Sequence, residues 1–210
     1  MGLCQLPPCI ITEYCPRESL YDVLKQASQR PDAAAELTWR RRLIIALDAA
    51  RGLLYLHLSE PPILHCDVKS PNILVDESWH AKICDFNLSE ILRRRRSGDE
   101  GTAACNPTWL APEVLDGGRA EAASDIYAFG MLLTWQLPWR GLTPFQVRRA
   151  VLDGRRPEVP PALPVSGAEQ FAGLEAYCQL MRDCWAHEPT ERPGLDAVAH
   201  QLSVLLEGLA

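Results

Sequence analysis

The sequence lacks the long apolar run that a membrane-spanning helix requires. No stretch approaches the roughly 18–20 consecutive apolar residues needed to cross a bilayer, although 47% of the 210 residues are apolar. The opening residues, MGLCQLPPCII, carry neither the basic region nor the cleavage pattern of a signal peptide. We therefore expect a globular protein of the cytoplasm with no membrane span, and the chain is long enough to bury a core.

Basic residues are too scattered to form a nucleic-acid-binding surface. The formal net charge is −6, and Lys and Arg do not gather on one periodic face. The one dense run is RRRR at 93–96, inside a charged, aperiodic segment (93–106) that also holds Ser97 and indicates a mobile loop. We expect this loop to be poorly ordered and the protein to have no nucleic-acid partner.

The eight cysteines show neither C-x-x-C pairs nor the Cys/His spacing of a zinc site. Most lie in apolar segments, as Cys9, Cys84 and Cys178 do. This pattern predicts reduced, buried thiols and argues against a disulfide framework or a metal site.

The apolar residues of this sequence are spaced mainly as in helices. The segment 39–58 places four apolar residues on one face and predicts the strongest helix: Leu43, Leu47, Ala50 and Leu54. The segment 123–135 is apolar nearly all round, which predicts a helix buried at the domain centre. An amphipathic helix closes the chain, with its apolar face at Val198, Leu202, Leu205 and Leu209. No internal repeat is present.

Shorter elements are expected between these helices. Residues 7–15 predict a short buried strand that ends in a turn, and 28–36 predicts a Pro/Ala-rich connector. Ser19, with Asp22 three positions later, resembles a capping box at a helix start. NILVD (72–76) and AKICDF (81–86) predict two short strands.

A dense polar cluster stands directly before an apolar strand in LHCDVKSPNILVD, residues 64–76. A surface loop does not need the apolar part and a core does not need the polar part, so the combination indicates a site. DFN begins at Asp85, 18 residues after Asp67, and APE begins 26 residues later at Ala111.

This order of motifs resembles the signature of protein kinases: a catalytic loop, then D-F-G, then A-P-E. LHCDVKSPNILV, NPTWLAPEVL, SDIYAFGMLL and CWAHEPTERP are similar to the tyrosine-kinase-like group, which includes Raf-like and MAP-kinase-kinase-kinase-like enzymes. The resemblance covers essentially the whole chain. It implies a mainly α fold (α+β overall), that is, a kinase large lobe that is helical with short β-hairpins and has an activation segment over 85–113.

The resemblance also implies a reaction, the transfer of the γ-phosphoryl group of ATP to Ser/Thr hydroxyls of a protein substrate. Asp67 would orient the hydroxyl and accept its proton, and Lys69 would reach the transferring phosphate. Asn72 and Asp85 would supply oxygen ligands for Mg²⁺. A lysine at position 69 is typical of serine/threonine-directed kinases.

By the same resemblance, residues 1–17 correspond to a small-lobe strand and the hinge, and residues 18–210 to the large lobe. Thr12 would be the gatekeeper, and backbone groups of Glu13 and Cys15 would bind adenine. Leu74 would form the floor of the base pocket.

Other matches imply structural roles. His65 would pack beneath Phe86, and Asp125 would bind backbone N–H groups of the catalytic loop. The resemblance also implies a charged clamp between Glu113 and Arg192.

The sequence departs from the family pattern in several places. Cys66 replaces the arginine before the catalytic aspartate, Asn87 replaces the glycine of D-F-G, and Asn106 stands where a threonine is usual. Neither a G-x-G-x-x-G motif nor a V-A-I-K-type lysine precedes the hinge. We therefore expect a small lobe that is largely absent from these residues, as in a piece of a longer kinase. The alternative is an incomplete, pseudokinase-like module that acts as a protein-binding scaffold.

Overall fold

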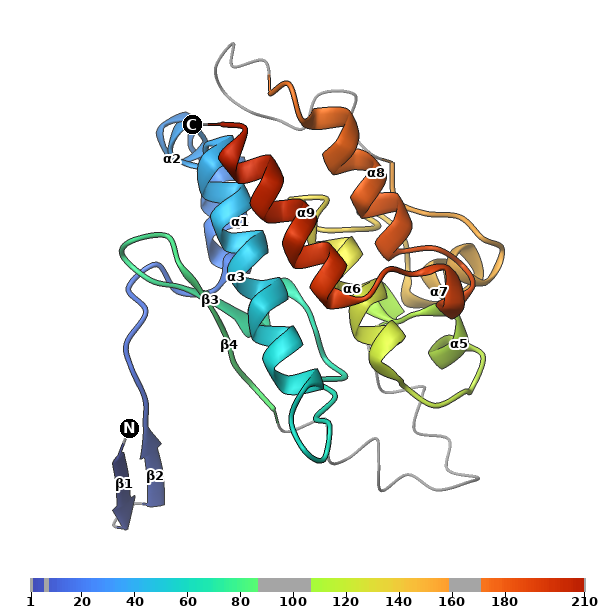
Figure 1. Cartoon of the computed structure of the whole chain (residues 1–210), viewed down its shortest axis with the longest axis horizontal. Helices are drawn as coiled ribbons and strands as arrows, with labels where there is room; N and C mark the ends of the chain where they lie inside the picture. Colours follow the sequence, from blue (N-terminus) through green and yellow to red (C-terminus); the bar gives the residue numbers. More distant parts are fainter. Residues whose placement is uncertain (1, 6–7, 87–106, 159–170, 210) are drawn as a thin grey trace.

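The computed structural model describes residues 2–5, 8–86, 107–158 and 171–209. Helices predominate in this part of the chain, and its strands form two separate two-stranded antiparallel sheets (Figure 1). The predicted mainly helical lobe with short β-hairpins is confirmed. The charged loop at 93–106 and residues Asn87, Ser97 and Asn106 lie outside the described residues.

The helices are α1 (Leu20–Gln29), α2 (Pro31–Glu36), α3 (Trp39–His57), α5 (Pro112–Leu115), α6 (Ala122–Leu132), α7 (Pro144–Leu152), α8 (Leu174–Cys184) and α9 (Leu195–Glu207). Short 3-10 turns are η1 (Ser70–Asn72), η3 (Pro107–Trp109) and η4 (Pro189–Glu191). The strands β1 (Gly2–Gln5) and β2 (Pro8–Ile11) form one sheet, and β3 (Ile73–Val75) and β4 (Ala81–Ile83) form the other.

Helix α6 is the buried centre of the fold, as its unbroken apolar sequence predicts. Tyr127, Phe129 and Leu133 are at most 1% exposed. The helix ends at Leu132, three residues before the predicted end, and Trp135 has a positive φ of 54° that a helix cannot accommodate. The helix was therefore predicted correctly and its C-terminal boundary was not.

Helices α3 and α9 pack against each other along much of their length (Figure 1). The predicted stripe on α3 is buried at Leu43, Leu47 and Ala50, and Leu54 is half-buried. On α9, Val198 and Leu202 are fully buried. Burial of these two apolar faces closes one side of the core around α6.

The N-terminal strand differs from the prediction. Residues 8–11 do form a strand, but it pairs with β1 as a hairpin that stands apart from the helices (Figure 1). Ile11 is 58% exposed, so the prediction of a buried strand is wrong for this residue. The hairpin has no apolar layer beside it that could cover Ile11 among the described residues.

Two further expectations concern the segments beside the predicted helices. The capping box is confirmed, since the Asp22 N–H donates to Ser19 Oγ and the Ser19 N–H donates to the Asp22 carboxylate. The connector expected at 28–36 is instead largely the helix α2, which begins at Pro31. Proline is favourable in the first turn because that position needs no intrahelical N–H donor.

The described cysteines differ in their burial. Five of the described cysteines are in no disulfide: Cys15, Cys178 and Cys184 are buried, while Cys66 and Cys84 are half-buried. Cys84 is thus more open than its apolar neighbours predicted. Within the described ranges, none of the helices combines the length and apolarity needed to span a bilayer.

Candidate active site

The turn before β3 brings three predicted site residues together. The Asn72 side-chain Nδ2 donates to the Asp67 backbone carbonyl at 2.9 Å and to Asp67 Oδ2 at 2.8 Å. Lys69 Nζ lies 2.7 Å from the same Oδ2. Asn72 is 4% exposed, whereas the Asp67 and Lys69 side chains are 17% and 29% exposed. A buried amide therefore orients a carboxylate that remains open to solvent.

His65 has the structural role that was expected. Its ring is 0% exposed and lies 5.4 Å from the Phe86 ring centroid. The Asp67 N–H donates to His65 Nδ1 at 3.3 Å, so Nε2 carries the proton that is donated to the Cys84 carbonyl at 3.1 Å. One neutral imidazole thereby joins the catalytic loop to the strand that leads into Asp85.

Asp125 binds backbone N–H groups of the predicted catalytic loop, as the resemblance implied. The His65 N–H donates to Asp125 Oδ2 and the Cys66 N–H donates to Oδ1, both at 2.8 Å. His57 Nε2 lies 2.9 Å from Oδ2, and Asp125 is 2% exposed. Three donors thus satisfy a buried carboxylate and fix the backbone beside Asp67.

Two residues of the predicted site region have left-handed backbone conformations. Cys66, before Asp67, has φ 62°, and Asp85 itself has φ 64°. Such conformations are uncommon for residues with a Cβ and are held by their surroundings. At Cys66, the hydrogen bond to Asp125 supplies part of that support.

Asp85 is exposed and lies just beyond β4. The Cys84 N–H donates to the Asn72 carbonyl at 3.0 Å, so the backbones of the two predicted metal ligands are neighbours. The binding of one metal ion by the side-chain oxygens of both Asn72 and Asp85 remains a prediction. Within the described ranges, His, Cys, Asp and Glu form no cluster of three that could hold a metal alone.

The amide of Asn72 nevertheless fits Mg²⁺. Its Nδ2 group is committed to Asp67, which turns Oδ1 away from that carboxylate. The hydrogen bonds of the Asn72 side chain to the described residues use Nδ2, which leaves Oδ1 for a ligand. A neutral oxygen beside an acidic residue suits a hard cation that takes its other ligands from phosphate and water.

The predicted adenine site lies where the hinge meets β3. The Val75 N–H donates to the Glu18 carbonyl at 2.9 Å, and Arg17 N–H donates to the Val75 carbonyl at 3.3 Å. Leu74 is half-buried, whereas Ile73 and Val75 are at most 1% exposed. Alternation along the strand therefore turns Leu74 to the opposite face from the core.

The three residues of the predicted hinge that were assigned to adenine binding differ in exposure. Thr12 and Glu13 are exposed, and Cys15 is 7% exposed. Glu13 pairs with Lys82 of β4 at 3.1 Å, and hydrogen bonding to Glu13 raises the pKa of Lys82. This pair ties the hinge to the strand before Asp85. Sequence reasoning missed Lys82 because nothing in its local pattern indicates a partner so distant in the chain.

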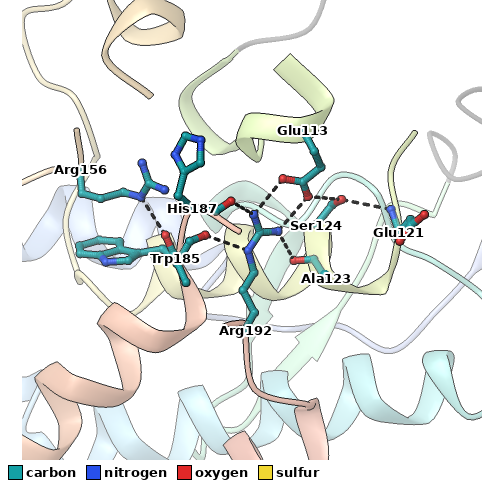
Figure 2. A network of polar contacts seen from close by, with 9 residues as sticks. Glu113, Glu121, Ala123, Ser124, Arg156, Trp185, His187 and Arg192 are labelled. Atoms are coloured by element: carbon teal, nitrogen blue, oxygen red, sulfur yellow. Dashed lines mark hydrogen bonds and ion pairs between the residues drawn. The ribbon is translucent and has the colours of Figure 1, made fainter. Parts of the chain in front are cut away.

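A second polar network joins the first turn of α6 to α5 and to the segment between α8 and α9 (Figure 2). The guanidinium of Arg192 donates to Glu113 through Nη1–Oε1 and Nη2–Oε2 contacts of 2.8 Å each, and its side chain is 0% exposed. Ser124 Oγ also donates to Glu113 Oε1, at 2.8 Å. The remaining Arg192 donors reach the carbonyls of Ala123, Ala186 and His187. The predicted Glu113–Arg192 clamp is confirmed.

An aspartate held by a lysine and an asparagine before a two-stranded sheet, and a Glu–Arg clamp beneath it, define the large lobe of a protein kinase. Residues 1–202 match the family model described as protein tyrosine and serine/threonine kinase. The chain therefore belongs to this family, and the resemblance stated from its motifs is confirmed.

Individual relatives carry serine/threonine kinase names. The chain is 41% identical over 209 residues to the probable serine/threonine-protein kinase drkA of Dictyostelium discoideum, covering 96% of this chain and 30% of drkA. It is 39% identical over 214 residues to the serine/threonine-protein kinase CTR1 of Arabidopsis thaliana, covering 99% of this chain and 24% of CTR1. The chain thus spans less than a third of the length of these relatives.

Proposed function

We propose that this chain is the catalytic lobe of an ATP- and Mg²⁺-dependent protein serine/threonine kinase that acts in signalling. The observation that carries the proposal is the geometry of Asp67, whose Oδ2 is bound by both Lys69 and Asn72. The contacts of the Asp67 carboxylate with described side chains are made by Oδ2, which leaves Oδ1 for a substrate hydroxyl. The free thiols are typical of a reducing compartment such as the cytoplasm.

In this reaction the hydroxyl oxygen of a substrate Ser or Thr attacks the γ-phosphorus as the bond to the β-phosphate oxygen breaks. Asp67 orients the hydroxyl and accepts its proton. Lys69, which is partly exposed beside Asp67, places a mobile positive charge near the transferring phosphate. The protein contributes positioning and charge neutralisation, with little covalent chemistry.

The metal and the base have separate proposed sites. Asn72 Oδ1 and the Asp85 carboxylate would hold Mg²⁺, which neutralises phosphate charge when bound. Backbone groups of Glu13 and Cys15 would bind adenine, with Thr12 as gatekeeper and Leu74 as the floor. In this scheme residues 1–17 supply the strand and hinge, 18–210 supply the large lobe, and 85–113 form the activation segment.

These residues reach the nucleotide from one side. The sequence holds no G-x-G-x-x-G motif that would clamp the α- and β-phosphates. Such positioning is worth roughly 7–11 kcal/mol of an activation barrier. We therefore expect no measurable transfer by the 210 residues alone, and transfer once a kinase small lobe is joined upstream.

The test is a kinase assay with ATP–Mg²⁺ and a generic Ser/Thr substrate. It compares the 210-residue chain, the chain joined to a small lobe, and the joined chain with Asp67→Ala. We expect activity only in the second. Asp116→Ala is the matched control, because Asp116 is an exposed carboxylate outside the proposed site.

Two outcomes would contradict this reading. Robust transfer by the 210-residue chain alone would refute the one-sided nucleotide site. A joined chain that folds and binds ATP but transfers nothing would support the alternative, a protein-binding scaffold.

A further inference from the structure

Helix α7 has two unlike faces. Val147, Ala150 and Val151 are at most 2% exposed and pack into the lobe. At about 100° per residue, Phe145 falls opposite this face, between Arg148 and Arg149. Phe145 is 74% exposed, and both arginines are exposed. We call Phe145, Arg148, Arg149 and the nearby exposed Arg140 the α7 surface.

The start of α7 is capped without negative charge. Thr143 and Gln146 form a capping box, and no acidic residue occupies the first turn. Within the helix itself, the partial positive charge of this end is therefore met by neutral capping side chains. Leu142 is 40% exposed and directly precedes the N-cap residue. An apolar residue at this position commonly packs against the first turns of the helix.

The surroundings are basic although the protein is acidic. Residues 140–158 contain five arginines and two acidic residues, whereas the whole chain carries a net charge of −6. Arg149 and Arg155 share one carboxylate, Asp153, each at 3.7 Å. For Arg140 and Arg148, the described residues offer no ion partner.

A single exposed aromatic residue needs no explanation by itself. Here the exposed ring shares one face of the helix with two exposed arginines, beside a helix start that is capped by neutral side chains, so apolar and electrostatic features coincide. The matching partner has carboxylates for the arginines and an apolar side chain for Phe145. A nucleic acid also carries negative charge, but Lys and Arg are otherwise scattered along this sequence and offer no long basic face for a polyanion to follow.

We propose that the α7 surface docks an acidic segment of a partner protein that carries an aliphatic side chain among its carboxylates. Helix α7 packs against η3 and α5 (Figure 1). This binding needs neither ATP nor phosphoryl transfer, so it stands apart from the proposed catalysis.

The probe is a short fluorescein-labelled peptide with a central Leu-Leu pair and aspartates on both sides, titrated with the full 210-residue chain by fluorescence anisotropy. We expect saturable binding that weakens as salt rises. Phe145→Ala weakens it about tenfold, since the variant loses the burial of an aromatic side chain. Arg148→Gln weakens it about threefold at low ionic strength.

Matched controls separate docking from general stickiness. Tyr55→Ala and Arg51→Gln remove an equally exposed aromatic residue and an exposed arginine from α3, and we expect both to bind the peptide normally. Peptides with Asn in place of Asp, or Ser in place of Leu, bind several-fold more weakly. Thermal unfolding confirms that each variant is folded.

Four results would overturn the proposal. Two of them are a peptide that does not bind at millimolar protein and a peptide that binds wild type and Phe145→Ala equally. Tighter binding of a single-stranded oligonucleotide than of the peptide would assign the surface to nucleic acid. Self-association that Phe145→Ala abolishes, seen by sedimentation, would assign it to a second copy of the chain.

Discussion

Replacing Arg192 by Met tests the Glu113–Arg192 clamp most directly. Met keeps an unbranched side chain near the Tyr127 ring, which lies 5.1 Å from the guanidinium carbon. It removes every hydrogen bond of the guanidinium. The perturbation therefore targets the polar network and spares most of the packing.

The expected loss follows from the groups left behind. The Glu113 carboxylate loses two charge-assisted hydrogen bonds but keeps the one from Ser124. Three backbone carbonyls also lose their donor. Breaking a buried ion pair by removing one partner costs about 3–5 kcal/mol. Because the Glu113 side chain is 22% exposed and gains some hydration, we expect about 3 kcal/mol.

Glu113→Gln removes the acidic partner of the same clamp. Its effect on the free energy of unfolding should depend on pH. Burial alone would raise the pKa of Glu113. Hydrogen bonds from Arg192, its own backbone N–H and Ser124, together with the Arg192 charge, outweigh burial and lower that pKa. A lowered folded-state pKa stabilises the folded protein above the unfolded pKa of about 4.3, and this stabilisation is lost as pH falls through the folded pKa.

The assay is urea unfolding of wild type, both single variants and the double variant, followed by circular dichroism. We expect Glu113→Gln to cost about 1–2 kcal/mol at pH 7, and its deficit to shrink below about pH 4.3. The double variant should cost less than the sum, because the two side chains interact directly. Additive costs, or a loss below about 1 kcal/mol for Arg192→Met, would refute the reasoning.

Three further predictions concern the core. Gly130→Ala should lower the free energy of unfolding by about 2 kcal/mol, measured in urea, because an added Cβ would lie 2.9 Å from the Cys184 Cβ; an unchanged midpoint would contradict this close approach. Asp125→Asn should cost about 2–3 kcal/mol in the same assay, since an amide cannot accept from both the His65 and Cys66 N–H groups as the carboxylate does; a neutral effect would argue against the anchor. Burial raises the pKa of the Cys184 thiol, so mass spectrometry should find iodoacetamide labelling of it only after unfolding, and rapid labelling of the native protein would contradict its burial.

Local sequence spacing was enough to predict that the polar residues of the predicted catalytic loop lie together, whereas the roles proposed for them came from the resemblance. Asp67, Lys69 and Asn72 lie within six residues, so one turn joins them whatever the rest of the fold does. The buried centre was also predictable, because α6 has no polar stripe that could face water. Both predictions used information contained in a single short segment.

The failures have physical causes that are equally local. The segment PDAAAE was interpreted as a connector because proline was given more weight than alanine, although proline suits the first turn of α2. Helices α7 and α8 were not predicted, since proline- and glycine-rich stretches on either side obscured their periodicity. In α8 the signal was present at Tyr177, Cys178, Met181 and Cys184, which are buried at helical spacing.

Contacts between distant segments could not be predicted without a family pattern. The Glu13–Lys82 pair joins the hinge to β4, and His57 reaches Asp125 from the end of α3. Each depends on how separate elements pack, which spacing along one element does not reveal. The clamp of Glu113 and the Asp125 anchor were expected only through the resemblance.

The first turn of α6 should not tolerate the insertion or deletion of a residue, because three consecutive residues there contact three different segments. Ala123 contacts the loop after α8, Ser124 contacts α5, and Asp125 contacts the catalytic loop. Inserting or deleting one residue here would rotate the following helix by about 100° and separate at least two of these attachments at once. Gly141 and Gly154 lie in turns where an added Cβ would meet no atom within 4 Å. Insertions and deletions between homologues should therefore collect near such turns and avoid residues 123–125.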